Sequence, residues 1–360
     1  MKVYDVAVAG AGVFGAWTAL HLRRRGHSVA LADPYGPGNS RSSSGGESRI
    51  LRLGYGPDEI YTRMAQRSFA QWREFSVFVN TGVLWTAPAG DPYANATRKV
   101  LTRCGVPFLT LLPSDLSARF PQLSLHVDRH GIYEPDSGVL MARRAVQTVA
   151  AEAVRLGVEY VNGAVDSVSA GSYVYACGPW LPKVFPELLD GLITPTRQEV
   201  FFFGVPAGDA RFAASAMPVW LDFSEECYAY TLPDLEHRGF KLAFDQHGRA
   251  FDPDCGDRSV ASKSIERARQ YLASHFPALS DAPLLEARVC QYENTSNGDF
   301  LIDRHPGMNN VWIAGGGSGH GFKHGPAVGE YVAGLIEGTA TAEPRFSLAA
   351  KSRERRRAVH

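Results

Sequence analysis

The sequence predicts a mixed α/β protein in which a parallel-sheet domain, discontinuous along the chain, is combined with a domain built on an antiparallel sheet. Three observations predict this fold class. The chain begins with a short apolar segment that leads directly into a glycine-rich turn, and a similar segment and turn recur near residue 315. Between them, from about residue 195, strand-like segments are separated by charged or proline-bearing loops. Since 360 residues exceed the usual domain length of roughly 150, two domains are expected.

The first four elements form a strand, turn, helix and strand. Residues 3–9 are short and mostly apolar, as in strands buried on both faces. A glycine-rich turn follows, then a helix over 16–25 and a second strand over 27–32. In such a unit the first glycine permits the turn, the second lets backbone N–H groups approach a pyrophosphate, and the third lets the helix pack on the strand. The unit therefore predicts a Rossmann-type dinucleotide site, with candidate ligands Gly10, Gly12, Val13, Phe14, Gly15 and, for the adenosine ribose, Asp33.

The remaining elements follow from the same patterns. Residues 34–56 are expected to be a long polar loop, which inside a compact domain is usually functional. The tail over 351–360 carries five basic residues and is expected to be a solvated, frayed end. We expect helices over 58–75, 141–156, 263–274 and 326–336. We also expect a buried strand that ends in a turn over 173–180, a buried strand over 311–314, and antiparallel strands over 198–205, 226–232 and 239–244.

The two nucleotide-type segments lie near opposite ends of the chain, so they indicate one domain interrupted by another. The expected nucleotide-binding domain comprises 1–80, 140–190 and 300–360. The expected substrate domain comprises 81–139 and 191–299.

Composition narrows the function classes. Lys+Arg and Asp+Glu both total 37, so the basic excess typical of nucleic-acid binding is missing. No apolar run approaches the roughly 18 residues of a membrane span, and Asp5 makes the N-terminus a poor signal peptide. Five widely spaced cysteines exclude CxxC zinc pairs and favour a reducing compartment, so we expect a cytoplasmic protein. Separately, we expect a monomer or small homo-oligomer. Metal catalysis is not supported, since no HExxH occurs.

The sequence lacks the motifs of two further protein classes, the serine hydrolases and the P-loop nucleotide-binding proteins. A GxSxG nucleophile turn around Ser318 would need glycine where His320 stands. No Gly-Lys-Ser/Thr sequence of a P-loop occurs. What remains is a dinucleotide that supplies its own chemistry, either a nicotinamide or a flavin.

Eight motifs follow one another between residue 3 and about residue 337. They are Gly10-x-Gly12-x-x-Gly15, Glu47-Ser48-Arg49-Ile50-Leu51-Arg52, Ala176-Cys177-Gly178-Pro179-Trp180, Arg197-Gln198, Gly239-Phe240-Lys241-Leu242, Cys290-Gln291-Tyr292-Glu293-Asn294-Thr295, Asp303-Arg304-His305-Pro306 and Gly319-His320-Gly321-Phe322-Lys323. In this order they resemble the flavoprotein amine oxidases of the sarcosine oxidase type, which include monomeric sarcosine, N-methyltryptophan and pipecolate oxidases.

The resemblance implies FAD, joined through its 8-methyl carbon to the sulfur of Cys290. A cysteine that adds to a flavin must act as a thiolate. The alternative is that Cys290 is a small buried apolar side chain, as free cysteines often are. The resemblance adds further cofactor-binding residues, namely Ser44, Arg49, Cys177, Gly178, Trp180, Gly317, Gly319, His320, Gly321, Phe322 and Lys323.

The resemblance also implies a substrate site. Arg52 and Lys323 would bind a substrate carboxylate, the arginine as a fork and the lysine as a point charge. Lys241 would lie above the flavin ring and stabilise superoxide formed from oxygen. Tyr230 and Tyr292 would line the substrate pocket. The alternatives are a surface ion pair for Arg52 or Lys323, a sheet-face position for Lys241, and ordinary packing for the tyrosines.

The sequence departs from the family at two pocket positions. Gly45 and Asp245 stand where sarcosine oxidases carry histidines, and residues 293–299 are more polar than usual. We therefore expect the family's chemistry with a different specificity. The implied reaction oxidises the C–N bond of a secondary amine or cyclic imino acid to an imine, with O2 reduced to H2O2. The alternatives are a flavin-dependent amino acid dehydrogenase with a carrier as acceptor, a redox-inactive flavin-binding protein and, last, a nicotinamide dehydrogenase.

Overall fold

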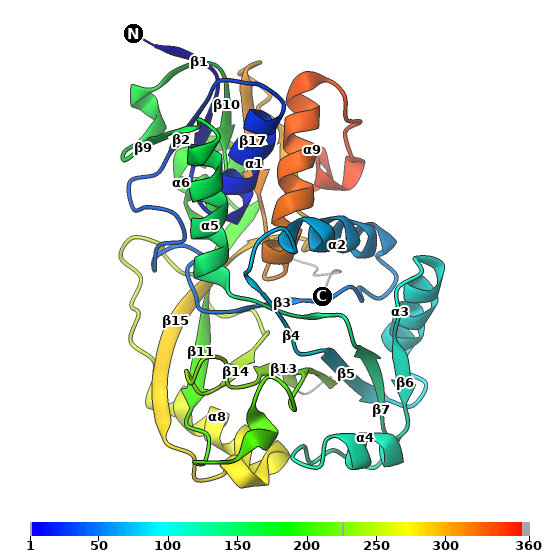
Figure 1. Cartoon of the computed structure of the whole chain (residues 1–360). Helices are drawn as coiled ribbons and strands as arrows, with labels where there is room; N and C mark the ends of the chain where they lie inside the picture. The colour runs from blue at the N-terminus through cyan, green and yellow to red at the C-terminus, as the bar shows by residue number, and fades with distance from the viewer. Residues whose placement is uncertain (1, 225–226, 355–360) are drawn as a thin grey trace.

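The structure is a computed structural model that describes residues 2–224 and 227–354. Its upper half in Figure 1 contains a six-stranded sheet with the strand order β16-β17-β10-β1-β2-β9. Five of these strands are parallel, and β16 pairs antiparallel with β17. The strands are β1 (Val3–Ala9), β2 (Val29–Ala32), β9 (Glu159–Val161), β10 (Ser169–Tyr175), β16 (Leu301–Arg304) and β17 (Val311–Gly315). Strands from both ends of the chain share one sheet, which confirms the discontinuous Rossmann-type fold.

The lower half contains an eight-stranded sheet with the order β15-β11-β14-β13-β12-β5-β7-β6. All neighbours are antiparallel except β12 and β5, so the expectation of an antiparallel sheet is confirmed with one parallel pair. The strands are β5 (Val83–Pro88), β6 (Leu109–Leu111), β7 (Arg129–Glu134), β11 (Ile193–Phe203), β12 (Val219–Ser224), β13 (Cys227–Leu232), β14 (Phe240–Phe244) and β15 (Leu284–Thr295).

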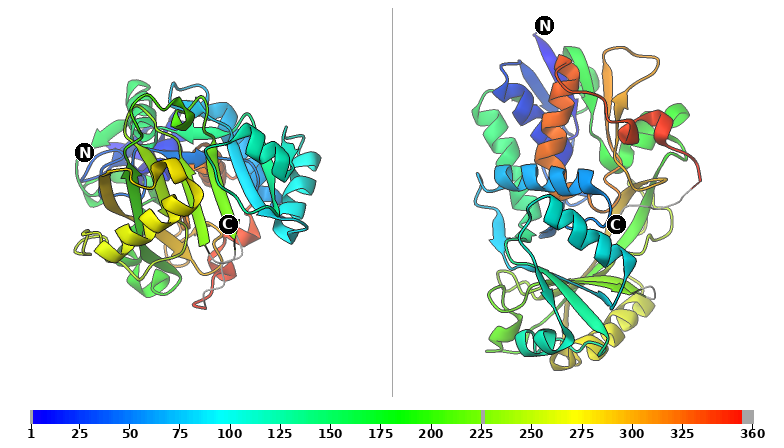
Figure 2. Two further views of the ribbon diagram at one scale, coloured as in Figure 1. Left: turned by 90° about the horizontal axis from the view of Figure 1, so that it is seen from below. Right: turned by 90° about the vertical axis from the view of Figure 1, so that its right-hand side faces the viewer.

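The helices cover the two sheets. Helix α1 packs against α5 and α9 beside the parallel sheet, and α2 lies across the junction of the two halves (Figures 1 and 2). In α5 the buried residues recur at helical spacing along one face, from Ala142 through Val146 and Val149 to Ala153. The helices are α1 (Val13–Arg24), α2 (Glu59–Trp72), α3 (Pro92–Arg103), α4 (Pro113–Arg119), α5 (Ala142–Arg155), α6 (Leu181–Val184), α7 (Pro186–Leu189), α8 (Ser262–His275) and α9 (Gly325–Glu337).

The polar loop expected over 34–56 is interrupted by a strand. β3 (Arg49–Leu51) pairs with β8 (Gly138–Leu140), which also pairs with β4 (Phe78–Asn80). Three residues form a strand here because a distant segment supplies their partners, so no local pattern reveals them. Arg49 begins this short strand, and Arg52 follows directly after it.

Residues 173–180 are expected to form a strand that ends in a turn, and the structure confirms this: β10 ends at Tyr175 and a 3-10 turn follows over Gly178–Trp180. Another expectation needs correction. The tail does not begin as a frayed end, since Lys351 is buried and its Nζ donates to the Arg345 carbonyl at 2.6 Å. Residues 355–360, and residue 226 of an expected strand, lie outside the described residues.

No helix in residues 2–224 and 227–354 is long and apolar enough to cross a bilayer. In the same described part of the chain, no three His, Cys, Asp or Glu side chains come together as metal ligands.

Candidate active site

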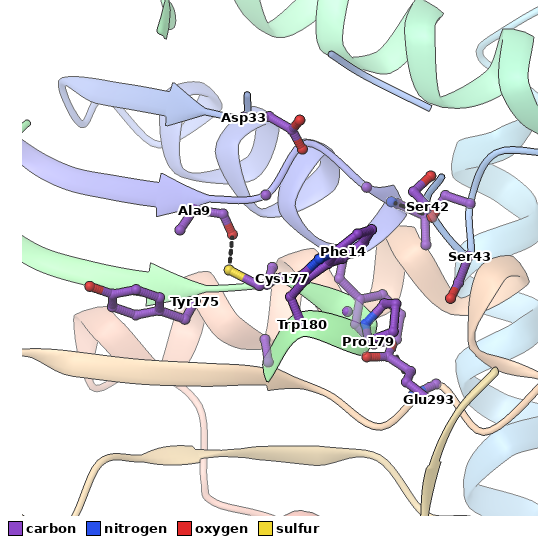
Figure 3. Close-up of a pocket in the computed structure, with 18 of the residues that line it drawn as sticks. Ala9, Phe14, Asp33, Ser42, Ser43, Tyr175, Cys177, Pro179, Trp180 and Glu293 are labelled. Carbon is purple, nitrogen blue, oxygen red and sulfur yellow. Dashed lines mark hydrogen bonds between the residues drawn. The ribbon is translucent and has the colours of Figure 1, made fainter. Parts of the chain in front are cut away.

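A cavity of about 620 Å³ lies at the carboxyl ends of the parallel strands β1, β2 and β10 (Figure 3). This is the edge where ligands bind in open α/β sheets. Most of the predicted cofactor ligands line this cofactor cavity, namely Gly10, Gly12, Val13, Phe14, Asp33, Ser44, Arg49, Cys177, Gly178, Trp180, Gly317, Gly319, Gly321 and Phe322.

The glycine-rich turn is sterically constrained. Gly10 has φ +97°, and a Cβ there would lie 2.5 Å from the Ala176 carbonyl oxygen. A Cβ on Gly15 would lie 1.8 Å from the Gly10 carbonyl oxygen. Gly15 does not line the cavity, so it lets the helix approach the strand instead of contacting the ligand. At the start of α1, the Val13 N–H donates to the Ser44 hydroxyl at 3.0 Å.

Asp33 ties the end of β2 to the turn. Its carboxylate accepts hydrogen bonds from the backbone N–H groups of Ala11 at 2.8 Å, Tyr35 at 2.8 Å and Gly36 at 3.0 Å. The side chain is buried at the cavity wall. These bonds give Asp33 a structural role in addition to the predicted ribose contact.

A second, smaller cavity of about 80 Å³ adjoins the first, and we call it the substrate cavity. It shares Arg49, Tyr292, Gly319 and Phe322 with the cofactor cavity. The predicted catalytic residues all line it, namely Arg52, Tyr230, Lys241, Tyr292 and Lys323. So do Cys290 and His320, which were predicted to bind the cofactor. Cys290, His320 and Lys323 do not line the cofactor cavity itself.

Lys241 lies on β14 and is 4% exposed. Its Nζ donates to the backbone oxygen of Ser48 at 3.0 Å and to the Ser48 hydroxyl at 3.2 Å. Burial, followed by the nearby Arg49 guanidinium, lowers the pKa of Lys241 to about 7. Lys241 is therefore a buried lysine on the wall of the substrate cavity.

Lys323 and Arg52 are also buried, so neither is a surface ion pair. Lys323 Nζ donates to the Tyr55 hydroxyl at 2.9 Å and to the His320 carbonyl at 3.0 Å. Burial and the Arg52 charge hold the pKa of Lys323 well below its usual value. The Arg52 guanidinium lies over the rings of Tyr55 and Trp85, at 4.2 and 4.4 Å from their centroids.

Glu134 fixes the chain around Arg52. Its carboxylate accepts from the backbone N–H groups of Leu53 at 2.7 Å and Gly54 at 3.0 Å, and from Trp85 Nε1 at 3.1 Å. Arg52 itself donates to the Gly54 carbonyl. This network holds the guanidinium at the cavity.

Cys290 lies on β15 beside Arg49. The Arg49 guanidinium is 3.8 Å from the Cys290 sulfur and donates to the Ser43 carbonyl at 2.7 Å. Arg49 therefore holds the loop and contacts the cysteine as well.

The two predicted tyrosines lie on the wall between the sheet and the cavity. The Tyr292 hydroxyl donates to the Asp245 carboxylate at 3.0 Å, and burial raises the pKa of Tyr292 well above its usual value. Asp245 is one of the two positions where the sequence departs from the resembled family, and it also lines the substrate cavity.

Sequence reasoning missed several residues of the site. Tyr55 donates to or accepts from His324 Nε2 at 2.7 Å and contacts Lys323, yet it lies in no motif. Ser48 and Glu134 were missed as partners of Lys241 and of the Arg52 segment. Glu293 lies in the motif that begins at Cys290 and in the polar segment 293–299, but it was not predicted as a cofactor ligand, although it lines the cofactor cavity.

The cofactor cavity suits a polar ligand with many hydrogen-bonding groups. Among the described residues, Ser43 Oγ and Glu293 Oε2 are buried at its wall without a hydrogen-bond partner. Burial raises the pKa of Glu293 to about 7. Buried polar groups are normally paired, so these two atoms indicate a bound ligand.

A glycine turn at the carboxyl ends of a parallel sheet, with a second cavity containing three buried cations beside it, defines a dinucleotide-dependent oxidoreductase. Residues 5–335 match the family described as DAO, FAD dependent oxidoreductase. The chain belongs to this family, and its cofactor is FAD rather than a nicotinamide.

The chain is similar to named proteins over almost its whole length. It is 30% identical to the monomeric sarcosine oxidase of Streptomyces avermitilis, covering 95% of each chain. It is 27% identical to the N-methyl-L-tryptophan oxidase of Salmonella heidelberg, covering 96% of this chain and 97% of the relative. Among solved structures, the L-proline dehydrogenase of P. horikoshii superposes with a TM-score of 0.84 at 20% identity, covering 96% of this chain and 97% of that one.

Proposed function

We propose that this protein is an FAD-dependent oxidase of a small amine or amino acid whose nitrogen is secondary, either N-methylated or in a ring. The product would be the imine, and O2 would be reduced to H2O2. The observation that carries this proposal is the junction of the two cavities at Arg49, Tyr292, Gly319 and Phe322, with buried cations on the substrate side. The names of the relatives, which refer to sarcosine and N-methyl-L-tryptophan, support the same substrate class.

The residues that line the cofactor cavity would hold FAD, and Cys290 would form its covalent link. When bound, FAD supplies the acceptor for a hydride equivalent from the carbon next to the amine nitrogen. The position of Cys290 supports the link, because its sulfur lies beside Arg49, a residue that lines both cavities.

Arg52 and Lys323 would bind the carboxylate of an amino acid substrate. Both cations are buried, and a carboxylate between them would stabilise their charged forms. Arg52, Lys323 and Lys241 would also disfavour a protonated amine in the same cavity. The amine would therefore bind in its neutral form, and no general base would be required.

Lys241 would act on oxygen instead of the substrate. Charge develops on oxygen as it is reduced, and a fixed ammonium in a buried site stabilises that charge more than it would in water. The hydrogen bonds that Lys241 Nζ donates to the backbone oxygen and hydroxyl of Ser48 would keep the ammonium in place.

The same proposal includes the arrangement of the chain. Residues 1–80, 140–190 and 300–360 would form the FAD-binding domain, and 81–139 and 191–299 the substrate domain. The described cysteines Cys104, Cys177, Cys255 and Cys290 are free thiols, which supports a cytoplasmic location.

An anaerobic substrate screen tests the proposal. N-methyl and cyclic amino acids are mixed with the purified yellow protein, and loss of the oxidised flavin absorbance identifies the substrate. Oxygen uptake with stoichiometric H2O2 is then expected. Reduction by substrate without oxygen uptake would show a dehydrogenase that uses a carrier. The absence of reduction by any amine or amino acid would show a redox-inactive flavin protein.

A further inference from the structure

We propose that the Glu293 carboxyl is a direct ligand of FAD and binds a hydroxyl group of the chain that joins the flavin ring to the pyrophosphate. The inference rests on the use of the cofactor cavity for FAD, and it does not depend on which amine is oxidised.

Strand β15 presents alternate residues to different cavities. Cys290 lines the substrate cavity, whereas Gln291 and Glu293 line the cofactor cavity. This alternation follows from the two-residue period of a strand. In Figure 3 the Glu293 side chain lies on the cavity wall close to Pro179.

Among the described residues, one carboxyl oxygen of Glu293 has a hydrogen-bond partner and the other has none. Oε1 accepts a hydrogen bond from the Gly317 backbone N–H at 3.2 Å. Oε2 has no partner among the described residues, although the residue is only 8% exposed. An unpaired buried carboxyl oxygen is costly, and the rise in its pKa to about 7 is the result of that burial.

One side of the Glu293 carboxyl is open to the cofactor cavity. A Cβ on Gly178, which lines this cavity, would lie 3.6 Å from Oε2 and would meet only Glu293 within 4 Å, its chain neighbours aside. On the Gly315 side, the Leu181 side chain fills the space. The backbone N–H groups of Gly316 and Gly317 lie beside the carboxyl, and no described side chain donates to Oε2, so a further donor would come from the cavity.

The position of Glu293 selects the hydroxyl-bearing part of FAD. The turn over Gly12–Gly15 suits the pyrophosphate, and Cys290 is the expected link to the flavin ring. Glu293 is three residues from Cys290 along the same strand, a separation of about 10 Å at roughly 3.4 Å per residue. A hydroxyl can donate to an ionised carboxylate and accept from a protonated carboxyl, so it satisfies Oε2 in either state.

The test measures FAD binding by the full-length protein with Cys290→Ser, in which binding is reversible whether or not the wild type forms a covalent link. The apoprotein is titrated with FAD and with analogues that each lack one hydroxyl of the linking chain. Glu293→Leu is expected to raise the Kd of FAD at least tenfold. Glu293→Gln is expected to stay within about threefold, because the amide keeps an acceptor and adds a donor. Glu286→Gln, which removes a carboxylate from the same strand outside the cofactor cavity, serves as the control.

The analogues identify the contact. With Glu293 present, one analogue should bind at least tenfold more weakly than FAD, and Glu293→Leu should abolish that difference. An unchanged Kd for Glu293→Leu, or the same loss with the analogue in both proteins, would overturn the proposal. If the Glu293→Leu variant does not fold, the protein that keeps Glu293 still tests the proposal. Equal affinity of that protein for FAD and for every analogue would by itself overturn the proposal. Since no substrate is present, these results are separate from any failure of the proposed amine oxidation.

Discussion

At the scale of single residues, the proposed active site is defined by three buried cations with different surroundings. Arg52 lies over two aromatic rings, Lys323 donates to a tyrosine, and Lys241 donates to Ser48. Arg52 and Lys323 share Tyr55 as a neighbour and Lys241 does not, which is the physical basis for proposing that the first two bind substrate and the third acts on oxygen.

Lys241→Met should slow re-oxidation by O2 at least about a hundredfold, corresponding to roughly 2.7 kcal/mol, with anaerobic reduction much less affected. The variant removes the cation that stabilises charge on oxygen and keeps the length of the side chain. Stopped-flow measurement of each half-reaction checks this, with the exposed Lys263→Met as control. If reduction collapses while re-oxidation stays fast, Lys241 binds substrate instead.

The oxygen reaction should also depend on pH. The pKa of Lys241 is lowered from 10.5 to about 7, so the cation is present below about pH 7 and is lost as the pH rises through that value. The rate of re-oxidation should fall across this range in the wild type and be flat in Lys241→Met. A wild-type rate that rises with pH across the same range would contradict the assigned role.

Arg52→Met and Lys323→Met should each weaken substrate binding by roughly tenfold or more. A charge-assisted bond to a desolvated carboxylate is worth about 1.5–3 kcal/mol. The decarboxylated analogue of the substrate should lose affinity for the wild type to a similar extent. Equal affinity for the acid and its decarboxylated analogue would refute the role of both residues as carboxylate ligands.

Cys290→Ser should release the flavin on acid precipitation, whereas the wild-type pellet should stay yellow. The serine hydroxyl cannot replace the thiolate needed for the link. Absorbance of the pellet and the supernatant measures this. Colour that leaves the wild type completely would disprove the covalent link and leave FAD binding intact.

At the scale of elements, strand β15 and the glycine turn organise the site. β15 pairs with β11 from Thr295 to Leu284 and supplies one side of both cavities. The turn before α1 brings backbone N–H groups to the cofactor cavity. It can pack this closely because a Cβ on Gly10 or Gly15 would collide with neighbouring backbone atoms.

Gly10→Ala should abolish FAD binding, since its Cβ would lie 2.5 Å from the Ala176 carbonyl and its φ is +97°. Gly26 provides a matched control, with φ +99° and no heavy atom within 4 Å of an added Cβ. Gly26→Ala should cost about 1 kcal/mol of stability and retain the cofactor. Flavin content of the purified proteins and their Tm values check both. Equal flavin content in the two variants would show that the close approach of the turn is unimportant.

At the scale of the whole molecule, a segment near the C-terminus joins parts that are distant in the sequence. Arg345 donates to Asp58 at 2.8 Å and to Asp299 at 2.7 Å, and Asp299 also accepts from the Tyr61 hydroxyl at 2.7 Å. The Tyr61 ring packs edge-on against His320 at 4.9 Å between centroids. The segment therefore supports the residues around the substrate cavity.

Arg345→Met should lower the free energy of unfolding by about 1–2 kcal/mol, because it leaves the buried Asp299 carboxylate with fewer donors. The partial exposure of Arg345 keeps the loss below that of a fully buried pair. Thermal unfolding should show a Tm lower by a few degrees. Arg211→Met, which breaks an exposed pair with Asp209, should change the Tm by much less. Equal shifts in the two variants would contradict the structural role of Arg345.

Local steric requirements made the nucleotide-binding half predictable from sequence. The apolar run of β1, the turn after it and the helix α1 depend on neighbours within about thirty residues, so their pattern is visible in the chain itself. Lys241, Arg52 and Cys290 were predicted through the motifs in which they lie. The short strand β3 was not, because its partner β8 lies far away in sequence. The burial of Lys351 was not predicted either, because it lies in a polar, basic segment with no apolar pattern, although its partner Arg345 is only six residues away.

By itself, the sequence determined the fold class, the glycine turn and the candidate residues, because each can be recognised from a short segment of consecutive residues. Only the tertiary structure decided how these residues meet. Ser48 and Lys241 are separated by 193 positions, and Tyr55 and His324 by 269, so no local pattern could pair them. It also decided that Oε2 of Glu293 is buried without a partner, since burial and hydrogen bonding depend on every segment that packs around an atom.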